Sequence, residues 1–292
     1  MSANLLVMTD SRNVASLRSQ WLGQRLRDLR EAAGISLTDA SEYLGLKNAS
    51  TMSRYETGVI PLRWTDVDAL LTLYGVADHA LRSELIDLAK EAWRKGWWDE
   101  YRDAVGDKRY LDAFWLESRS RHIKIFSFGL LHGLLQTPAY MDAVFRDDPT
   151  MDEAARTRAT ELRHARQRVI TEGSAALTVI VHETILRQKV TDSATTREQL
   201  AHLLDLGRRG RVTLRVIGFD TSVLRAHAGS FVLFDLGEPF GTVAYVENFA
   251  GCLYLESPAV DRYLSAYDNI EKAAFTTGES AKIIKRAIEG WK

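Results

Sequence analysis

The residues whose types and spacing suggest a binding site lie in a short polar stretch near the N-terminus. Short polar and basic side chains gather there between Gly45 and Gly58. Side chains of this kind donate hydrogen bonds to phosphates and base edges when a helix carries them into the major groove of DNA. The predicted DNA-contacting residues are Lys47, Asn48, Ser50, Thr51, Ser53 and Arg54, together with Ser36 ahead of the preceding helix.

Three short helices are predicted to position these side chains. The first is amphipathic and ends at Gly34, because apolar residues recur at helical spacing before it, at Leu22, Leu26, Leu29 and Ala33. Ser36 can cap a second helix, with Asp39 in the first turn, and Gly45 ends that helix. The third runs from residue 48 or 49 to 57, and Gly58 closes it. Two short helices joined by a tight glycine turn are typical of a helix-turn-helix unit.

The third helix has one side for the core and one for a partner. Met52 and Tyr55 can face the core with Leu44, while the predicted DNA-contacting residues face outward. Glu56 interrupts this polar and basic pattern with a negative charge. We expect Glu56 to bond inside the domain, to an arginine of the first helix.

The chain resembles the Xre-type, phage-repressor-like helix-turn-helix family in the stretch LRDLREAAGISLTDASEYLGL, followed by STMSRYETG. The resemblance implies DNA binding through the third helix. Leu37 departs from the family, which usually has a Gln there that helps to grip a phosphate, and Ser41 stands where the family has a small Ala. A three-helix packing unit without DNA binding is the alternative.

The amino-acid composition is typical of a globular protein. Of its 292 residues, 46% are hydrophobic and 26% are charged, which suggests two domains. No apolar run is long enough to span a bilayer, and the first twenty residues lack the pattern of a signal peptide. The single cysteine, Cys252, excludes an internal disulfide and a cysteine-built zinc site. We expect a cytoplasmic protein without membrane association.

Charge in the DNA-binding region is balanced. Residues 1–76 contain eight Lys or Arg and eight Asp or Glu residues. Non-specific DNA binding depends mostly on phosphate neutralisation, so a single neutral unit should bind non-specific DNA weakly. A homodimer or a partner protein could supply the missing contacts.

The expected organisation has four parts. Residues 1–20 form a flexible arm, 21–76 the helix-turn-helix domain, and 77–108 connecting helices. Residues 109–292 form an α+β regulatory or partner-binding domain with a mostly antiparallel five-strand sheet. Its strands are predicted at 175–183, 211–219, 229–237, 240–248 and 252–256, and its helices at 110–126, 138–145, 152–170, 196–206, 258–275 and 279–288.

Two groups of side chains in this second half could bind a partner protein. Trp97, Trp98 and Trp115 could line a partner site, although large aromatics more often pack between domains. The predicted helix 152–170 carries five arginines, which could receive an acidic surface or could simply be solvated. The five are Arg156, Arg158, Arg163, Arg166 and Arg168.

The second half also resembles a known domain. The motifs GWWDEY, GLLQTPAYM, RQRVI, HETILR, AHAGSFVLF, AYVE and LYLE occur in the order found in the C-terminal domain of unknown function of actinobacterial Xre-type regulators. His132 stands where that family usually has Pro. The resemblance implies that a small partner protein, encoded nearby, modulates the regulator.

Catalytic and cofactor signatures are missing from the sequence. His182 and Glu183 begin a His-Glu-x-x-His pattern, but Leu186 occupies the position of the second histidine that zinc would need. No phosphate loop and no Gly-x-Ser-x-Gly elbow is present. We therefore predict no enzyme, no metal and no cofactor. A ligand pocket remains an alternative to core and turn roles for Gln136, Tyr140, His227, Tyr245 and Glu247.

These observations favour a sequence-specific, DNA-binding transcriptional regulator whose C-terminal domain responds to a small protein. The alternative is an antitoxin-like interaction module, which sequesters a small partner and binds DNA only to regulate its own gene.

Overall fold

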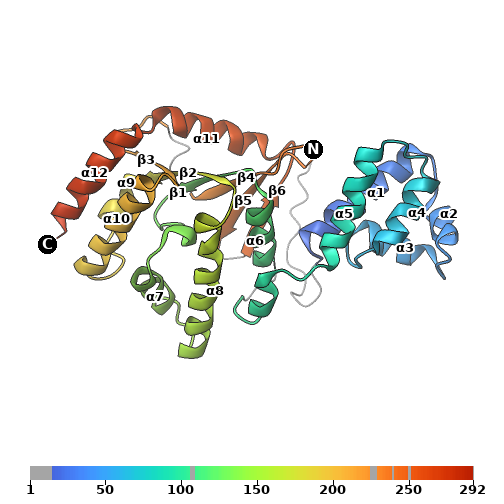
Figure 1. Cartoon of the computed structure of the whole chain (residues 1–292), viewed down its shortest axis with the longest axis horizontal. Helices are drawn as coiled ribbons and strands as arrows, with labels where there is room; N and C mark the ends of the chain where they lie inside the picture. Colours follow the sequence, from blue (N-terminus) through green and yellow to red (C-terminus); the bar gives the residue numbers. More distant parts are fainter. Residues whose placement is uncertain (1–14, 106–108, 224–228, 239, 249–250, 292) are drawn as a thin grey trace. The chain divides into compact units, whose positions relative to one another are not determined.

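The computed structural model describes residues 15–105, 109–223, 229–238, 240–248 and 251–291, and these fold into two compact units. The first unit runs to Arg102 and also takes in residues 106–112. The second consists of residues 103–105 and 113–292. Figure 1 shows a first unit built of helices and a second in which helices cover a sheet.

The first unit is helical throughout its described part. Its elements are α1 (Leu17–Ala32), α2 (Leu37–Tyr43), α3 (Ala49–Glu56), α4 (Trp64–Leu73), α5 (His79–Trp93) and the 3-10 helix η2 (Trp97–Tyr101). Leu22, Leu26, Met52 and Leu70 are buried between them, as the helical spacing predicts. α5 packs against α1 and α4, so it belongs to this unit and is more than a connection.

α1 begins within the range predicted as a flexible arm, residues 1–20. Ser16 caps α1, accepting the N–H of Ser19, so residues 17–20 are helical. Leu17 and Trp21 are buried and extend the apolar stripe one turn before Leu22. The expectation for residues 1–14 lies outside the described residues.

The sheet of the second unit has six strands and is mixed, so the prediction of five mostly antiparallel strands is wrong. The strands are β1 (His122–Ser127), β2 (Ala176–His182), β3 (Thr213–Ile217), β4 (Phe231–Asp235), β5 (Thr242–Asn248) and β6 (Gly251–Leu255). Their order is β3-β2-β1-β4-β5-β6. β1 and β3 pair with β2 in parallel, while β4, β5 and β6 continue the sheet antiparallel from β1.

The strand that the sequence analysis missed is β1. The helical spacing of 110–126 is real only as far as Arg119, where α6 (Tyr110–Arg119) ends. Residues 122–127 then alternate between two faces, with Ile123 and Ile125 on one and Lys124 and Phe126 on the other. Because β1 lies at the centre of the sheet, the error also hid the parallel pairs.

Helices cover both faces of the sheet (Figure 1). α11 (Asp261–Ala273) lies on one face, where Tyr267 and Ile270 pack with Phe126 and Ile180. Residues 257–260 form a turn before it, so Pro258 is not the first helical residue that the sequence predicted. The remaining helices are η3 (Gly133–Leu135), α7 (Pro138–Arg146), α8 (Glu153–Thr171), α9 (Glu183–Arg187), α10 (Ser193–Arg208) and α12 (Thr277–Gly290).

The β3 edge of the sheet is covered rather than left open. Val216 donates its N–H to Ser280 Oγ at 2.9 Å, and its carbonyl accepts the N–H of Phe275, also at 2.9 Å. These two bonds fix the start of α12 against the edge strand, which protects backbone groups that would otherwise template aggregation. In the described part of the chain, no helix is long and apolar enough to cross a bilayer.

Candidate nucleic-acid interface

The turn before α2 is closed by a reciprocal pair of hydrogen bonds. Asp39 N–H donates to Ser36 Oγ at 3.1 Å, and Ser36 N–H donates to the Asp39 carboxylate at 3.2 Å. The bonds from Ser36 lower the pKa of Asp39. The hydroxyl of Ser36 also donates to Asp39 at 2.7 Å, so this predicted DNA-contacting residue is exposed but already engaged in the cap.

Asn48 organises the start of α3. Its Oδ1 accepts the backbone N–H of Thr51 at 3.1 Å, which caps the helix. The same oxygen accepts the Ser50 hydroxyl at 2.6 Å and the Thr51 hydroxyl at 3.2 Å. The first turn of α3 therefore presents a preorganised cluster of three polar side chains.

The structure brings the predicted α3 residues together on one accessible side. Lys47, Asn48, Ser50 and Arg54 are exposed, and Thr51 and Ser53 are partly so. The opposite side holds Met52 and Glu56, both buried. Among the residues that the structure describes, neither Lys47 nor Arg54 is in an ion pair, so both cations remain available to phosphates.

A buried ion pair ties α3 to α1, as the sequence predicted. Arg30 Nε and Nη2 donate to the two oxygens of Glu56 at 2.6 and 3.0 Å, with side-chain exposures of 8% and 4%. These bonds raise the pKa of Arg30 in spite of its burial. Arg30 Nη1 also donates to the Ile35 carbonyl at 2.8 Å, which fixes the turn between α1 and α2. One side chain thus orients both helices of the motif.

Gly23 allows the close approach of α1 and α3, and the sequence analysis missed it. A Cβ on Gly23 would lie 2.5 Å from the carbonyl oxygens of Tyr55 and Glu56. A Cβ on Gly58, which has φ at +72°, would lie 2.6 Å from the backbone nitrogen of Gln20. A glycine inside an amphipathic helix was the available signal, since it costs stability unless another backbone needs the space.

The α8 arginines do not form the exposed basic surface that the sequence suggested. Arg166 forms a two-oxygen ion pair with the buried Glu117, with a closest approach of 2.6 Å. Arg163 donates to Gln136 Oε1 at 2.6 Å and lies over the ring of Phe145. Burial lowers the pKa of Arg163 to about 10.

Two of the outer arginines of α8 are also engaged. Arg158 pairs with Asp103 at 3.2 Å and with Glu161 at 2.9 Å, and Arg156 donates to the Met151 carbonyl. Arg168 is exposed. The partners of Arg163 and Arg166 lie up to 49 residues away in sequence, so helical spacing could not reveal them.

The three tryptophans that were predicted to form one partner site belong to two different units. Trp97 and Trp98 meet edge to face with ring centroids 5.7 Å apart in the first unit, where Trp98 is buried. Trp115 is buried and belongs to the second unit. Trp93, which was not in the predicted set, is more than half exposed and donates its Nε1–H to the Leu62 carbonyl at 2.7 Å.

The residues considered for metal or ligand chemistry have structural partners. His182 ends β2 with its ring between those of Phe128 and Phe219, and Leu186 is buried. Within the described ranges, no cluster of His, Cys, Asp or Glu is placed to hold a metal ion. Gln136 and Tyr140 are buried, and the Tyr245 hydroxyl donates to Glu247 at 3.4 Å. His227 lies outside the described residues.

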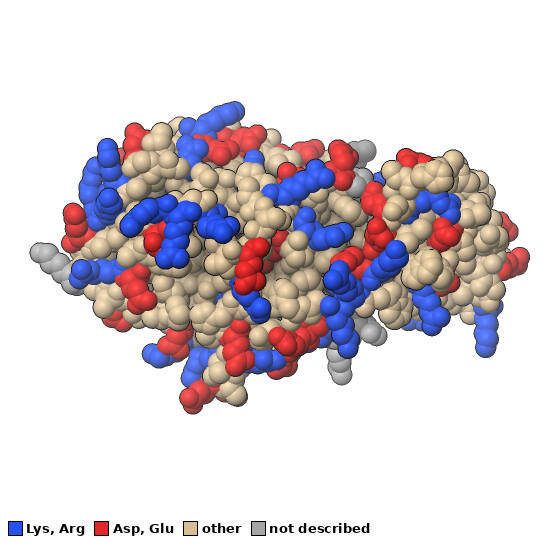
Figure 2. All heavy atoms as spheres, viewed as in Figure 1, with Lys and Arg blue, Asp and Glu red and all other residues tan. Residues whose placement is uncertain are grey.

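Charges of both signs are interspersed on the face of each unit seen in Figure 2. This agrees with the balanced count for residues 1–76. The visible face of the first unit therefore presents no broad positive field of the kind that attracts DNA at long range.

Comparison with known proteins assigns both halves of the chain. A helix-turn-helix domain family matches residues 21–85, which include α2 and α3, and this match indicates a DNA-binding regulator. A domain of unknown function, DUF5753, matches residues 110–286. No curated protein and no solved structure matches the chain in the same comparisons. Since the second match spans more than half of the 292 residues, the chain belongs to the DUF5753 family and carries a helix-turn-helix domain before that domain.

Proposed function

We propose that this protein is a sequence-specific transcriptional regulator of the Xre type that reads an operator with α3. The observation that carries the proposal is the exposed polar side of α3, presented opposite the buried Met52 and Glu56. Helices of this motif contact base edges with their N-terminal residues. Asn48, Ser50 and Thr51 occupy that position here, with Lys47 and Arg54 flanking them for phosphates.

The regulator acts as a homodimer in this proposal. One unit offers a single recognition helix and no net charge over residues 1–76. Two copies double the phosphate contacts and place two recognition helices about 34 Å apart, one turn of DNA. Specific binding then requires two half-sites in the operator, and the protein works in the cytoplasm where such DNA lies.

The C-terminal α+β domain is the regulatory part of the proposed function, and its ligand is a small protein. Support comes from the resemblance to regulators encoded beside a small partner. The proposal does not place the partner on Arg163 and Arg166 of α8, because these two are engaged with Gln136 and Glu117 inside the unit.

Operator binding by α3 variants tests the proposal. An operator is first selected from random DNA by the full chain, and affinities are then measured in a shift assay at one fixed salt concentration. Thr51→Ala and Arg54→Ala should each weaken operator binding, by about 1–3 kcal/mol where the lost contact is to a base. Lys90→Ala removes a surface charge from α5 and serves as the control, with unchanged affinity expected. Equal affinities for wild type and both α3 variants would refute the assignment of α3.

A further inference from the structure

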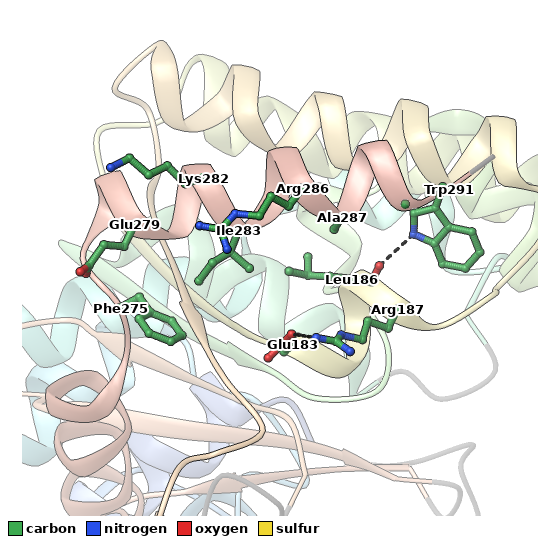
Figure 3. Close-up of a pocket in the computed structure, with 11 residues that line it drawn as sticks. Glu183, Leu186, Arg187, Phe275, Glu279, Lys282, Ile283, Arg286, Ala287 and Trp291 are labelled. Carbon is green, nitrogen blue, oxygen red and sulfur yellow. Dashed lines mark hydrogen bonds and ion pairs between the residues drawn. The ribbon is translucent and has the colours of Figure 1, made fainter.

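A groove of about 860 Å³ lies in the second unit between α9, Phe275 and α12. Its walls come from α9, including Glu183, Leu186 and Arg187, and from one side of α12 (Figure 3). The α12 residues that line it recur every three or four positions, from Glu279 to Gly290. The eleven steps between these two residues, at 1.5 Å each, correspond to about 16 Å, so the groove is elongated.

The groove is held open by fixed contacts at both ends. At one end, the backbone of Phe275 and the side chain of Ser280 bond to Val216 of β3. At the other end, Trp291 Nε1–H donates to the Leu186 carbonyl at 2.9 Å (Figure 3). These bonds fix α12 against β3 at one end of the groove and against α9 at the other.

Apolar side chains form part of the lining of the groove. Phe275, in the loop between α11 and α12, is 40% exposed at one end of the groove. Ile283, Ala287 and Trp291 continue the apolar surface along α12. Ordered aromatic and aliphatic side chains left accessible in a concave site favour a ligand with apolar groups of its own.

The rim of the groove carries positive charge that the unit does not neutralise. Lys282 and Arg286 form no ion pair among the described residues. The two acids of the groove are already engaged: Glu183 with Arg187 and the N–H of Phe219, and Glu279 with the N-cap Thr276. Hydrogen bonds from Thr276, together with the nearby charge of Lys282, lower the pKa of Glu279.

We propose that this groove binds an acidic peptide segment with apolar side chains, supplied by a partner protein. Carboxylates of the segment meet Arg286 and Lys282, and its apolar side chains cover Phe275 and Ile283. The length of the groove fits about three turns of helix or about five extended residues. The proposal rests on the proposed regulation by a small protein, and it places the acidic partner on α12 instead of α8.

Matched charge reversals test the electrostatic part in the full chain. Tagged wild type, Arg286→Glu and Lys285→Glu proteins are expressed in the native host, and proteins retained at stoichiometric amounts are quantified. Both substitutions change the charge by the same amount on neighbouring exposed positions, but Lys285 lines a different hollow, between α10 and α12. We expect Arg286→Glu to lower retention of the partner at least tenfold and Lys285→Glu to leave it within twofold.

A second pair of variants tests the place and the chemistry of the occupant. Ala287→Trp fills the groove without changing charge and should also abolish retention, while operator binding in the shift assay is kept. A photoreactive benzoylphenylalanine at position 287 should cross-link to one peptide of the retained protein, and mass spectrometry should show acidic and apolar residues in it.

The possible results distinguish a failure of the groove proposal from a failure of the proposed function. Retention of the same protein by wild type, Arg286→Glu and Ala287→Trp, or a cross-linked peptide without acidic residues, would overturn the groove while leaving a protein partner in place. Stoichiometric retention of no protein by wild type, with or without a bound metabolite in its stead, would overturn both.

Discussion

Replacing Glu56 by Ala should destabilise the helix-turn-helix unit more than any single surface change. The substitution removes the carboxylate that pairs with Arg30, whose side chain is only 8% exposed in the intact unit. Breaking a buried pair by removing one partner costs about 3–5 kcal/mol, because an uncompensated charge stays buried. A domain has only about 5–15 kcal/mol of stability in total, so Glu56→Ala should leave α1–α3 close to unfolding.

Removing both charges should cost much less than removing one. In the double variant Arg30→Met with Glu56→Leu, apolar side chains of similar length fill the same space and no charge is buried. The Ile35 carbonyl loses its donor at 2.8 Å, a loss of about 1 kcal/mol. We therefore expect the double variant to be more stable than Glu56→Ala.

Hydrogen exchange on the full chain measures this without assuming two-state unfolding of two units. The amides of α1 and α3 report the local free energy of opening, and peptides from the sheet of the second unit provide the internal control. A loss below about 1 kcal/mol for Glu56→Ala, or a double variant less stable than the single one, would refute the reasoning.

Four further predictions follow from other features. Gly23→Ala places a Cβ 2.5 Å from two carbonyl oxygens. It should weaken operator binding and lower the free energy of unfolding by about 1–3 kcal/mol. Gly34→Ala, with open space around it, should lower the free energy of unfolding by about 1 kcal/mol. Burial, with the charges of Arg166 and Arg163, holds the pKa of His132 well below its usual range. At mildly acidic pH, His132 is therefore protonated in the unfolded chain but neutral in the folded chain. The free energy of unfolding should fall as pH drops below about 6.5, by up to about 1.4 kcal/mol per pH unit. His132→Pro should lessen that slope, as measured by urea titrations at pH 7 and 5.5. Proline fits this position without backbone strain, because His132 has φ at −60° and its N–H makes no hydrogen bond within the described residues. Sedimentation at operator-saturating concentration should show a dimer, and a lone monomer would contradict the two-half-site operator. Elemental analysis should find no stoichiometric zinc, and zinc-dependent hydrolysis lost in Glu183→Gln would contradict the absence of an enzyme.

The N-terminal unit was predictable in detail because its signals are local. Ser36 with Asp39, and the glycines after α1, α2 and α3, fix helix ends within a few residues of themselves. The Arg30–Glu56 pair was predictable because a lone acid in a basic helix needs a cation nearby. Gly23 was not, because its role depends on which backbone lies opposite.

The second unit was less predictable because its determinants are non-local. His122 to Ser127 contains too few residues to establish a period of its own beside the strongly helical α6. Helical periodicity does not identify the partner of each charge. Arg166 of α8 was therefore predicted to bind a partner or to be solvated, whereas it pairs with Glu117 inside the unit. The groove on α12 carries no motif and follows from packing alone.

The cap of α3 has a consequence for the bases that this protein can prefer. The hydroxyls of Ser50 and Thr51 each have one proton, and both protons point at Asn48 Oδ1. While the cap is intact, these hydroxyls can accept hydrogen bonds but cannot donate them, so they suit neither phosphate oxygens nor guanine O6 and N7. The donors that the major groove offers are the amino groups of adenine and cytosine. We therefore expect adenine or cytosine at the operator positions beneath the first turn of α3, a bias in composition set by a helix cap.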